Sequence, residues 1–249
     1  MHTFFAPDLN ENTSFVELNK EEAHHALQVL RLKEDDEIVL FNGSGIKANA
    51  RLVPSGKRKA GAEVITLEKI KKTEPRLSIC LGLIKNRTRL EWACEKLTET
   101  GVNDIILLET ERTERSKFRT DRIEGILLSA AKQSLSAWLP ELSHQPLDSF
   151  LTEKKLGSAD TVFILAHEKQ ITNESGPKTS FEFPDLRDEI IKAGFKHICV
   201  FVGPEGGFSE DEVSRILSLS CSYPLWLGEQ RLRAETAAVQ LAGLFRFAL

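Results

Sequence analysis

The chain has 249 residues, of which 41% are hydrophobic and 28% are charged, and its formal net charge is −4. This length suits one large domain or two modest ones with a buried core, and the composition excludes a disordered or collagen-like chain. Proteins that bind nucleic acid through their overall charge are basic, so any such contact here must come from local patches of positive charge. One patch is predicted in residues 38–62, which hold five cations and no acid.

The cysteines and the start of the sequence indicate a reducing compartment. The four cysteines form no C-x-x-C pair, and Cys80 and Cys199 lie in apolar, strand-like runs, which predicts buried free thiols. The first residues include no long apolar segment, and no apolar run reaches the length that spans a membrane. The six histidines have no partners at metal-ligand spacing. We therefore expect a cytoplasmic protein without a bound metal.

The amino-terminal part of the sequence predicts a small β-rich domain. A short helix is expected over residues 20–30. The strands expected after it are Glu37–Phe41, 46–53 and 62–67. Gly-rich turns join these strands, which favours a small barrel. The charged stretch 69–75 contains a terminal proline and predicts a boundary, so we expect one domain over residues 1–72 and a second over residues 73–249.

The remaining sequence alternates between strands and helices. Strands are expected over residues 77–84, 102–108, 161–166, His197–Val202 and 224–227. Helices are expected over residues 88–100, 121–136, 209–219 and 235–249. Residues 170–180 are polar, with Gly and Pro, and predict a loop. Near-continuous apolar strands between helices indicate an α/β domain, with a parallel sheet covered by helices on both faces.

Three of these strands run into polar or Gly-rich turns, over residues 164–168, 202–208 and 227–233. Ligands bind outside the carboxyl ends of strands in open α/β sheets, and glycines let the backbone approach a ligand closely. The alternative is that all three are merely tight turns between strands and helices. The motifs of a P-loop, of a dinucleotide-binding G-x-G-x-x-G turn and of a G-x-S-x-G elbow are absent from the sequence.

Several motifs occur together near the end of the chain. Residues 202–209 are followed by Leu227, Gly228 and the run 232–237. Further motifs lie at residues 85–87, 91–92, 96–102, 111–112, 114–116, 131–134 and Pro140, and near the start at His2, Phe4, Phe5, His25 and residues 29–31. In combination they resemble the RsmE family, the uridine-N3 methyltransferases of 16S ribosomal RNA. The resemblance covers nearly the whole chain, and its two carboxyl-terminal motifs are together highly specific.

The resemblance implies an α/β fold in which a PUA-like β-barrel for RNA precedes a SPOUT methyltransferase domain with a trefoil knot. It also implies an obligate homodimer that uses S-adenosyl-L-methionine to methylate N3 of a specific uridine in 16S ribosomal RNA of the small ribosomal subunit. Knots are too rare for a sequence pattern to predict one. The residues expected to bind the cofactor are Leu165, His167, Glu168, Gly203, Pro204, Glu205, Gly206, Leu227, Gly228, Leu232, Arg233 and Thr236.

Methylation of uridine N3 requires loss of the imide proton and stabilisation of the charge that this leaves on the ring carbonyls. Arg233 lies in the third turn, and its guanidinium could stabilise that charge. Pairing with Glu205 or Glu235 is an equally good interpretation of Arg233. Either carboxylate could instead accept the proton, and the sequence does not choose between them.

Cationic and polar side chains are candidates for holding the RNA backbone. The residues expected to contact RNA are His25, Arg31, Lys57, Arg58, Lys85, Arg87, Arg112, Arg115 and Gln133. A solvated surface charge is the alternative for each cation. The last helix, over residues 235–249, is apolar nearly all round, which predicts burial against both the core and a second subunit.

The sequence departs from the family at Thr3, Ser136, Trp138 and Gln230, where arginine is usual, and at Ala234, where threonine is common. These changes bear on RNA-phosphate contacts more than on the cofactor. Trp138 could stack on a base or pack in the protein. Two other functions stay open: methylation of another base or a ribose, and an inert RNA-binding or assembly protein. The sequence does not say whether naked RNA or an assembled subunit is the substrate.

Overall fold

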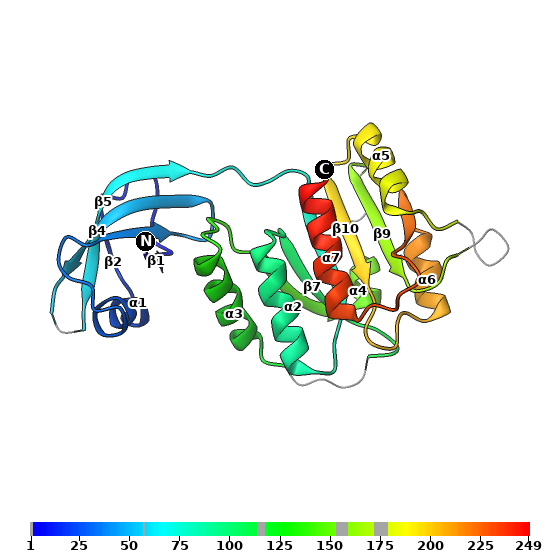
Figure 1. The fold of residues 1–249 in the computed structure, drawn as a ribbon, viewed down its shortest axis with the longest axis horizontal. Coiled ribbons are helices and arrows are strands. Elements are labelled where there is room, and N and C mark those ends of the chain that lie inside the picture. The colour runs from blue at the N-terminus through cyan, green and yellow to red at the C-terminus, as the bar shows by residue number, and fades with distance from the viewer. Residues whose placement is uncertain (1, 57, 114–117, 153–158, 172–178) are drawn as a thin grey trace. The chain divides into compact units, whose positions relative to one another are not determined.

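The computed structural model describes residues 2–56, 58–113, 118–152, 159–171 and 179–249 (Figure 1). The chain forms two compact units. The first comprises Met1–Lys72 and Leu128–Leu139, and the second comprises Thr73–Leu127 and Pro140–Leu249. The short segment Leu128–Leu139 is thus part of the amino-terminal unit, although it lies far along the sequence.

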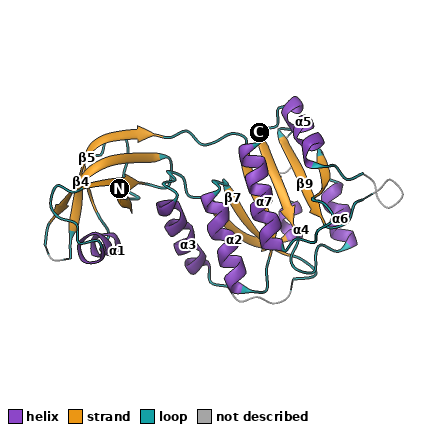
Figure 2. Ribbon diagram, in the orientation of Figure 1, coloured by secondary structure: helices purple, strands orange, loops and turns teal. Residues whose placement is uncertain are grey.

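The first unit is built on one five-stranded sheet (Figure 2). Its strands are β1 (His2–Phe5), β2 (Phe15–Glu17), β3 (Glu37–Phe41), β4 (Ile46–Pro54) and β5 (Ala60–Lys69), in the order β1-β3-β4-β5-β2. β1 pairs parallel with β3, and the other neighbours are antiparallel. The three predicted strands are confirmed, whereas the short strands β1 and β2 were not predicted. Closure of the sheet into a barrel stays a prediction.

The predicted helix over residues 20–30 is present in two parts. It begins as α1 (Lys20–His24), where the N-cap Asn19 accepts a hydrogen bond from the backbone N–H of Glu22. It continues as a single π-helical turn, η1 (His25–Val29). Such turns are rare and are frequently found at functional sites.

The segment Leu128–Leu139 packs onto the first unit through Trp138. Gly45 has a φ of +96°, and a Cβ atom there would lie 2.3 Å from Cζ2 of Trp138. The indole N–H of Trp138 donates to the carbonyl of Ile70 over 3.1 Å. The ammonium group of Lys72 lies 5.3 Å from the centre of the indole ring. Trp138 is therefore a packing residue, and only a residue without a side chain fits at position 45.

The second unit is an α/β domain with a parallel six-stranded sheet, as predicted. Its strands are β6 (Arg76–Gly82), β7 (Asp104–Glu109), β8 (Glu141–Pro146), β9 (Thr161–His167), β10 (His197–Val202) and β11 (Ser222–Trp226), in the order β11-β9-β10-β6-β7-β8. All five pairings are parallel. β10 lies at the centre, between β9 and β6, so its carboxyl end is flanked by the ends of both neighbours.

Helices cover both faces of this sheet. They are α2 (Arg87–Glu99), α3 (Thr120–Gln133), α4 (Leu147–Leu151), α5 (Phe183–Ala193), α6 (Glu210–Leu217) and α7 (Ala234–Phe247). One core cluster contains buried side chains of α2, α5 and α7, and a separate cluster contains those of α4 and α6. Two apolar clusters on one sheet require near-continuous apolar strands, which is why the strand pattern predicted this arrangement.

Three elements of the second unit were not predicted. β8 is an edge strand with the sequence ELSHQP, and its residues are mostly exposed. α4 is only five residues long, and α5 has Pro184 in its first turn and is capped at its end by Gly194, whose φ is +69°. Cys80, Cys94 and Cys199 are buried free thiols, as expected for the first and last, and Cys221 is exposed. Within the described parts of the chain, every helix is too short or too polar to cross a membrane.

Candidate active site

A cavity of about 690 Å³ lies at the carboxyl ends of β9, β10 and β11. Cavities of this size hold small molecules and cofactors. Its wall is formed by the three predicted turns, by the residues after the first of them, by α6, by the start of α7 and by Arg112. The lining residues are Arg112, Ala166, His167, Glu168, Lys169, Gln170, Ile171, Val202, Gly203, Pro204, Glu205, Gly207, Phe208, Glu210, Val213, Ser214, Leu217, Leu227, Gly228, Gln230, Arg231, Leu232, Arg233, Ala234 and Ala237.

The turn after β10 is closely packed on itself. The N–H of Gly207 donates to the carbonyl of Pro204 over 2.8 Å, and Gly207 has a φ of +69°. A Cβ atom at Gly203 would lie 3.0 Å from Cα of Gly207. Glycine at these positions therefore lets the chain reverse directly above the strand end.

The helix start that follows this turn is held by a capping box. The Ser209 side chain accepts from the N–H of Glu212, and the Glu212 carboxylate accepts from the N–H of Ser209 over 2.8 Å. The other oxygen of Glu212 accepts from the N–H of Glu111 over 2.8 Å. One buried carboxylate thus fixes both the beginning of α6 and the loop that carries Arg112.

The turn after β11 leads directly into α7. Gly228 has a φ of +106°, a conformation that favours glycine. An ion pair of 2.9 Å between Arg231 Nη2 and Glu168 Oε2 joins this turn to the turn after β9. The turn after β9 is also held by His167, whose Nδ1 lies 2.8 Å from the carbonyl oxygen of Lys169. The loops on this side of the cavity are therefore tied to one another by polar contacts.

Arg233 is the N-cap of α7 and lines the cavity. Among the described residues, it forms no ion pair with either carboxylate that the sequence had offered. Glu235 lies 3.5 Å from Arg89, measured from Oε1 to Nε. Glu205 accepts a hydrogen bond of 3.2 Å from the backbone N–H of Lys85. Arg233 thus lines the cavity without pairing with either carboxylate.

Nine of the predicted cofactor residues line the cavity. They are His167, Glu168, Gly203, Pro204, Glu205, Leu227, Gly228, Leu232 and Arg233. The other three are placed differently: Leu165 is fully buried, Thr236 is exposed on α7, and the carbonyl of Gly206 accepts from Arg112 over 2.9 Å. Of the candidate catalytic groups, Arg233 and Glu205 line the cavity, whereas Glu235 is turned towards Arg89.

Several lining residues were not predicted as part of the cofactor site. Gln230 and Arg231 lie in the third predicted turn, and Lys169 directly follows the first, so all three follow from their sequence neighbours. Phe208, Glu210, Val213, Ser214 and Leu217 belong to α6 or the residues before it. Arg112 comes from the loop after β7 and was predicted only as an RNA contact. The packing of α6 and of this loop against the strand ends is a long-range feature, which no local pattern signals.

The described candidates for RNA contact are all exposed, and they are divided between the two units. The first unit carries His25, Arg31, Arg58 and Gln133, and the second carries Lys85, Arg87 and Arg112. Lys57 and Arg115 lie outside the described residues. In the first unit, a smaller cavity of about 290 Å³ is lined by Lys20, His24, Gln28 and Arg58. Such a cluster of nitrogen donors suits a phosphate group.

The first turns of α2 carry a dense network of charge next to these candidates. Arg87 donates to Glu91 over 2.7 Å, and Arg122 donates to the other oxygen of the same carboxylate over 2.9 Å. The hydrogen bond from Arg122, with the added effect of Arg87, lowers the pKa of Glu91 to about 2. Glu91 is therefore ionised at any working pH and holds both guanidinium groups on this surface.

A parallel-sheet domain with a cofactor-sized cavity at its strand ends, joined to a β-rich unit, defines a class of two-domain enzymes. The model of the RNA methyltransferase domain family matches residues 71–246, and that of the RNA methyltransferase PUA domain matches residues 18–65. The chain belongs to this RNA methyltransferase family. It is an RNA methyltransferase with a PUA domain, and the predicted resemblance to the RsmE family is confirmed by the relatives below.

Curated relatives share the name Ribosomal RNA small subunit methyltransferase E. The protein of Rickettsia conorii is 27% identical over 234 residues, which cover 93% of this chain and 88% of the relative. That of Bacillus subtilis is 28% identical over 227 residues, or 87% and 84% of the two chains.

Solved structures agree over nearly the full length. A probable rRNA-methyltransferase of Porphyromonas gingivalis has a TM-score of 0.80 and 29% identity, covering 98% of this chain and 97% of its own. The Ribosomal RNA small subunit methyltransferase E of Neisseria gonorrhoeae, bound to S-adenosyl methionine, has a TM-score of 0.78. At 23% identity over 100% and 98% of the two chains, it attests to the shared fold.

Proposed function

We propose that this chain transfers a methyl group from S-adenosyl-L-methionine to N3 of a uridine in 16S ribosomal RNA of the small subunit. The observation that carries the proposal is the cavity at the carboxyl ends of β9, β10 and β11. Arg233 and Glu205 are both part of its wall. The curated relatives modify ribosomal RNA of the small subunit, as their names state. The uridine and its N3 atom rest on the sequence resemblance to the RsmE family.

The residues of the cavity fit the cofactor. A volume of about 690 Å³ accommodates a nucleoside with an amino-acid chain. Gly203 and Gly228 present backbone groups without a side chain, which suits hydrogen bonds to an adenine or ribose. Leu227, Leu232 and Phe208 supply apolar surface. When bound, S-adenosyl-L-methionine supplies an activated methyl group on its sulfonium, and S-adenosylhomocysteine is left after transfer.

The protein's own contribution to the reaction is positioning and electrostatics. We assign to Arg233 the stabilisation of negative charge on the uracil carbonyls, because Arg233 lines the cavity and a guanidinium stays charged and donates in a fork. The N3 proton passes to a carboxylate as the bond from N3 to the methyl carbon forms. We assign that role to Glu205, because Glu205 lines the cavity and Glu235 does not. The Lys85 N–H donates to Oε2 of Glu205 and so orients the carboxylate that accepts the proton.

We propose that residues 1–72 form an RNA-binding domain and that residues 73–249 form the catalytic domain, with Leu128–Leu139 as a structural part of the first unit. Arg112, Lys85 and Arg87 would hold RNA phosphates near the cavity, and His25, Arg31, Arg58 and Gln133 would do so on the PUA-like domain. Lys57 and Arg115 belong to the same proposal by their sequence position. The protein would act in the cytoplasm, where ribosomal subunits are assembled.

We also propose a trefoil-knotted catalytic domain, a closed PUA-like barrel and a homodimer. The knot rests on the sequence resemblance to the RsmE family, and the parallel sheet with the order β11-β9-β10-β6-β7-β8 is the sheet in which it would form. The dimer is supported by α7, which buries one face in the core while Phe247 near its end is 80% exposed. Sedimentation of a dilute sample should give the mass of a dimer. A folded, active monomer would contradict this assembly.

Product identification tests the proposed reaction. Small ribosomal subunits from a strain that lacks the gene are incubated with the protein and S-adenosyl-L-methionine, and their nucleosides are analysed by mass spectrometry. The expected product is 3-methyluridine in 16S ribosomal RNA. A methylated ribose or another base would support the alternative substrate, and cofactor binding without any methylated product would support an inert RNA-binding protein. Naked 16S RNA in a parallel reaction tells which assembly state is the substrate.

A further inference from the structure

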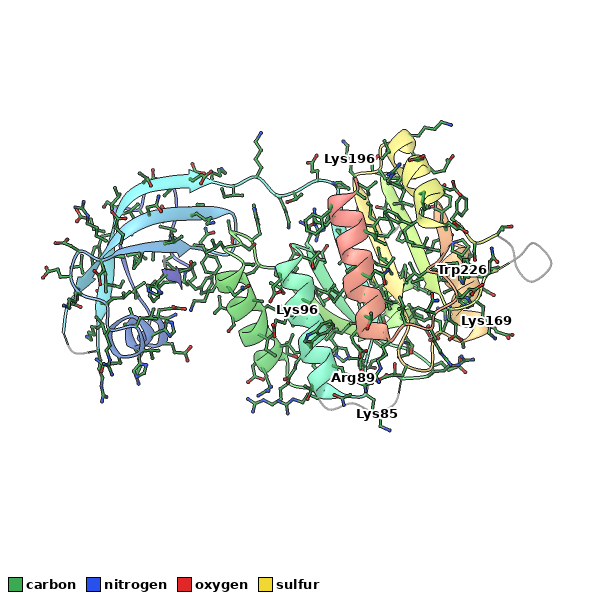
Figure 3. All side chains as sticks on the ribbon, in the orientation of Figure 1. Lys85, Arg89, Lys96, Lys169, Lys196 and Trp226 are labelled. Carbon is green, nitrogen blue, oxygen red and sulfur yellow. The ribbon has the colours of Figure 1, made fainter. Side chains whose placement is uncertain are left out.

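The start of α2, together with the residue before its N-cap, contacts two separate walls of the cavity. Before the helix, the backbone N–H of Lys85 donates to Glu205 in the turn after β10, over 3.2 Å. One turn later, Arg89 Nε lies 3.5 Å from Oε1 of Glu235, in the first turn of α7. Lys85 and Arg89 lie at the same end of α2 (Figure 3), and α2 and α7 pack side by side (Figure 1). A short segment of α2 is thus linked to both elements that carry the proposed catalytic groups.

The link to α7 ends on a buried carboxylate. Glu235 is 6% exposed, and its Oε2 has no hydrogen-bond partner within the described structure. A buried carboxylate is strongly unfavourable unless a cation or hydrogen-bond donors compensate it. The positive end of the α7 dipole provides part of that compensation, and Arg89 provides the cationic side chain. The position of Glu235 therefore depends on Arg89.

The same helical turn forms part of the cavity wall. Arg233 is the N-cap of α7, and Arg233, Ala234 and Ala237 all line the cavity. Glu235 lies among them in the sequence but is turned the other way, towards α2. A shift that brought the Glu235 carboxylate to water would carry Arg233 with it, because both belong to one rigid turn. In well-oriented active sites, a displacement of about 1 Å lowers the rate by roughly a hundredfold.

We propose that Arg89 is a positioning residue for methyl transfer, which acts through Glu235 to hold Arg233 in the cavity. The proposal rests on the proposed function and adds to it a residue outside the cavity wall. It also gives Glu235 a role as an anchor of α7 rather than as a proton acceptor. The N–H of Lys85 holds Glu205 in the same way, so both catalytic groups take their positions from one segment.

The test compares Arg89→Gln, Arg89→Lys and Glu235→Gln with the double variant Arg89→Gln/Glu235→Gln. Arg89→Gln should lower kcat by about tenfold or more and weaken S-adenosyl-L-methionine by a few-fold in calorimetry, with little change in KM for the RNA. Arg89→Lys keeps the charge and should restore much of the loss. The double variant should be faster than Arg89→Gln, because a neutral amide at position 235 no longer needs a cation.

Lys96→Gln is the matched control. Lys96 lies on the same helix and pairs with Glu95 and Glu99. It is further along α2 than Arg89, which lies near the start of the helix (Figure 3). Its substitution should leave kcat and cofactor affinity unchanged. The wild-type protein must methylate ribosomal RNA in the same assay. A wild type that binds the cofactor but yields no product would contradict the proposed function and not the role of Arg89.

With an active wild type, four results would overturn the positioning role. The first is a normal kcat for Arg89→Gln. The second is a lower melting temperature with unchanged kcat and cofactor affinity, which marks a purely structural pair. The third is a raised KM for RNA with unchanged kcat, which makes Arg89 an RNA contact. The fourth is an Arg89→Gln/Glu235→Gln variant as slow as Arg89→Gln, with Glu235→Gln equally slow, which makes Glu235 the proton acceptor.

Discussion

The strands of the parallel sheet all begin at one edge, the amino-terminal edge, and all end at the other, the carboxyl-terminal edge. These two edges differ sharply in how their polar groups are used. At the amino-terminal edge, Asp104 is buried and accepts hydrogen bonds from Arg76 and Ser78. At the carboxyl-terminal edge, the strands end in glycine turns around an open cavity that Arg233 and Glu205 line. The amino-terminal edge is thus a stabilising edge, whose charges pair with one another, and the carboxyl-terminal edge is a functional edge, where Arg233 lines the cavity without pairing with Glu205 or Glu235. A single sheet can therefore be stabilised at one end and act at the other.

The hydrogen-bond network at the amino-terminal edge continues beyond Asp104. His197 donates from Nε2 to the Ser78 hydroxyl over 2.7 Å, because the single hydroxyl hydrogen of Ser78 is already donated to Asp104. Next to it, the side chain of Asn103 accepts from the N–H of Leu77 over 2.8 Å and from Arg246 over 2.9 Å. Arg246 comes from α7, so this edge also secures the far end of the helix whose first turn carries Arg233.

The largest effect is expected from Arg233→Ala, which removes the proposed charge stabiliser of the functional edge. Turnover in single-turnover methyl transfer should fall by about a hundredfold or more, as with loss of other preorganised donors. Arg233→Lys should restore little, because an ammonium does not reproduce the guanidinium fork. Melting temperature and cofactor affinity should change little. Lost cofactor affinity with normal turnover at saturation would instead make Arg233 a binding residue.

Substitution of the turn glycines should affect the cofactor. A Cβ at Gly203 would already lie 3.0 Å from Cα of Gly207, and Gly228 has a φ of +106°. Gly203→Val and Gly228→Val should therefore distort the turns and weaken S-adenosyl-L-methionine by about fiftyfold, as overpacking of this kind costs about 1–3 kcal/mol. Titration calorimetry on folded protein measures this. Wild-type affinity in both variants would remove the cofactor from these turns.

The stabilising edge should respond in the opposite way. Asp104→Asn removes the buried charge that pairs with Arg76, whose own side chain is 44% exposed. We expect a loss of about 2 kcal/mol in the free energy of unfolding, below the roughly 3–5 kcal/mol of a fully buried pair because Arg76 remains hydrated. Urea unfolding measures the loss, and the folded variant should keep its turnover. A normal unfolding free energy would show that this network contributes nothing to stability.

The smallest effect concerns pH. Burial lowers the pKa of His197, although Asp104 acts against the shift. Between that lowered pKa and about pH 6.5, the His197 site binds more protons in the unfolded chain than in the native one. The contribution of His197 to the free energy of unfolding is therefore complete above about pH 6.5 and is lost as the pH falls through the lowered pKa. His197→Gln still donates to Ser78 but does not titrate. Its stability should fall less than that of the wild type between about pH 7.5 and about pH 5.5, by under about 1 kcal/mol. Parallel pH curves would refute this.

The sequence predicted the functional edge better than the stabilising one. The turns after β9, β10 and β11 follow apolar runs and contain glycine or charge, so local pattern predicted all three, and the family motifs also covered the turns after β10 and β11. The edge strand β8, with its polar sequence, carries no such signal. The partners of single charges were also beyond local reasoning. Arg89, and not Arg233, pairs with Glu235, because the packing of α2 against α7 decides which guanidinium is near.

The membership of Leu128–Leu139 in the first unit was likewise beyond the sequence. It depends on a ring that covers Gly45, which lies 93 residues before Trp138. A glycine in a turn and a tryptophan after a helix each have ordinary local explanations. Only their contact explains both, and contacts of this separation leave no trace in periodicity or composition.

The most direct test of the division between the two edges is the single-turnover rate of methyl transfer to unmodified small ribosomal subunits. The wild type, Arg233→Ala and Asp104→Asn are measured side by side at a temperature where all three are folded. We expect Arg233→Ala to be slower by about a hundredfold and Asp104→Asn to match the wild type. Equal losses in the two variants, or a normal rate for Arg233→Ala, would contradict the account.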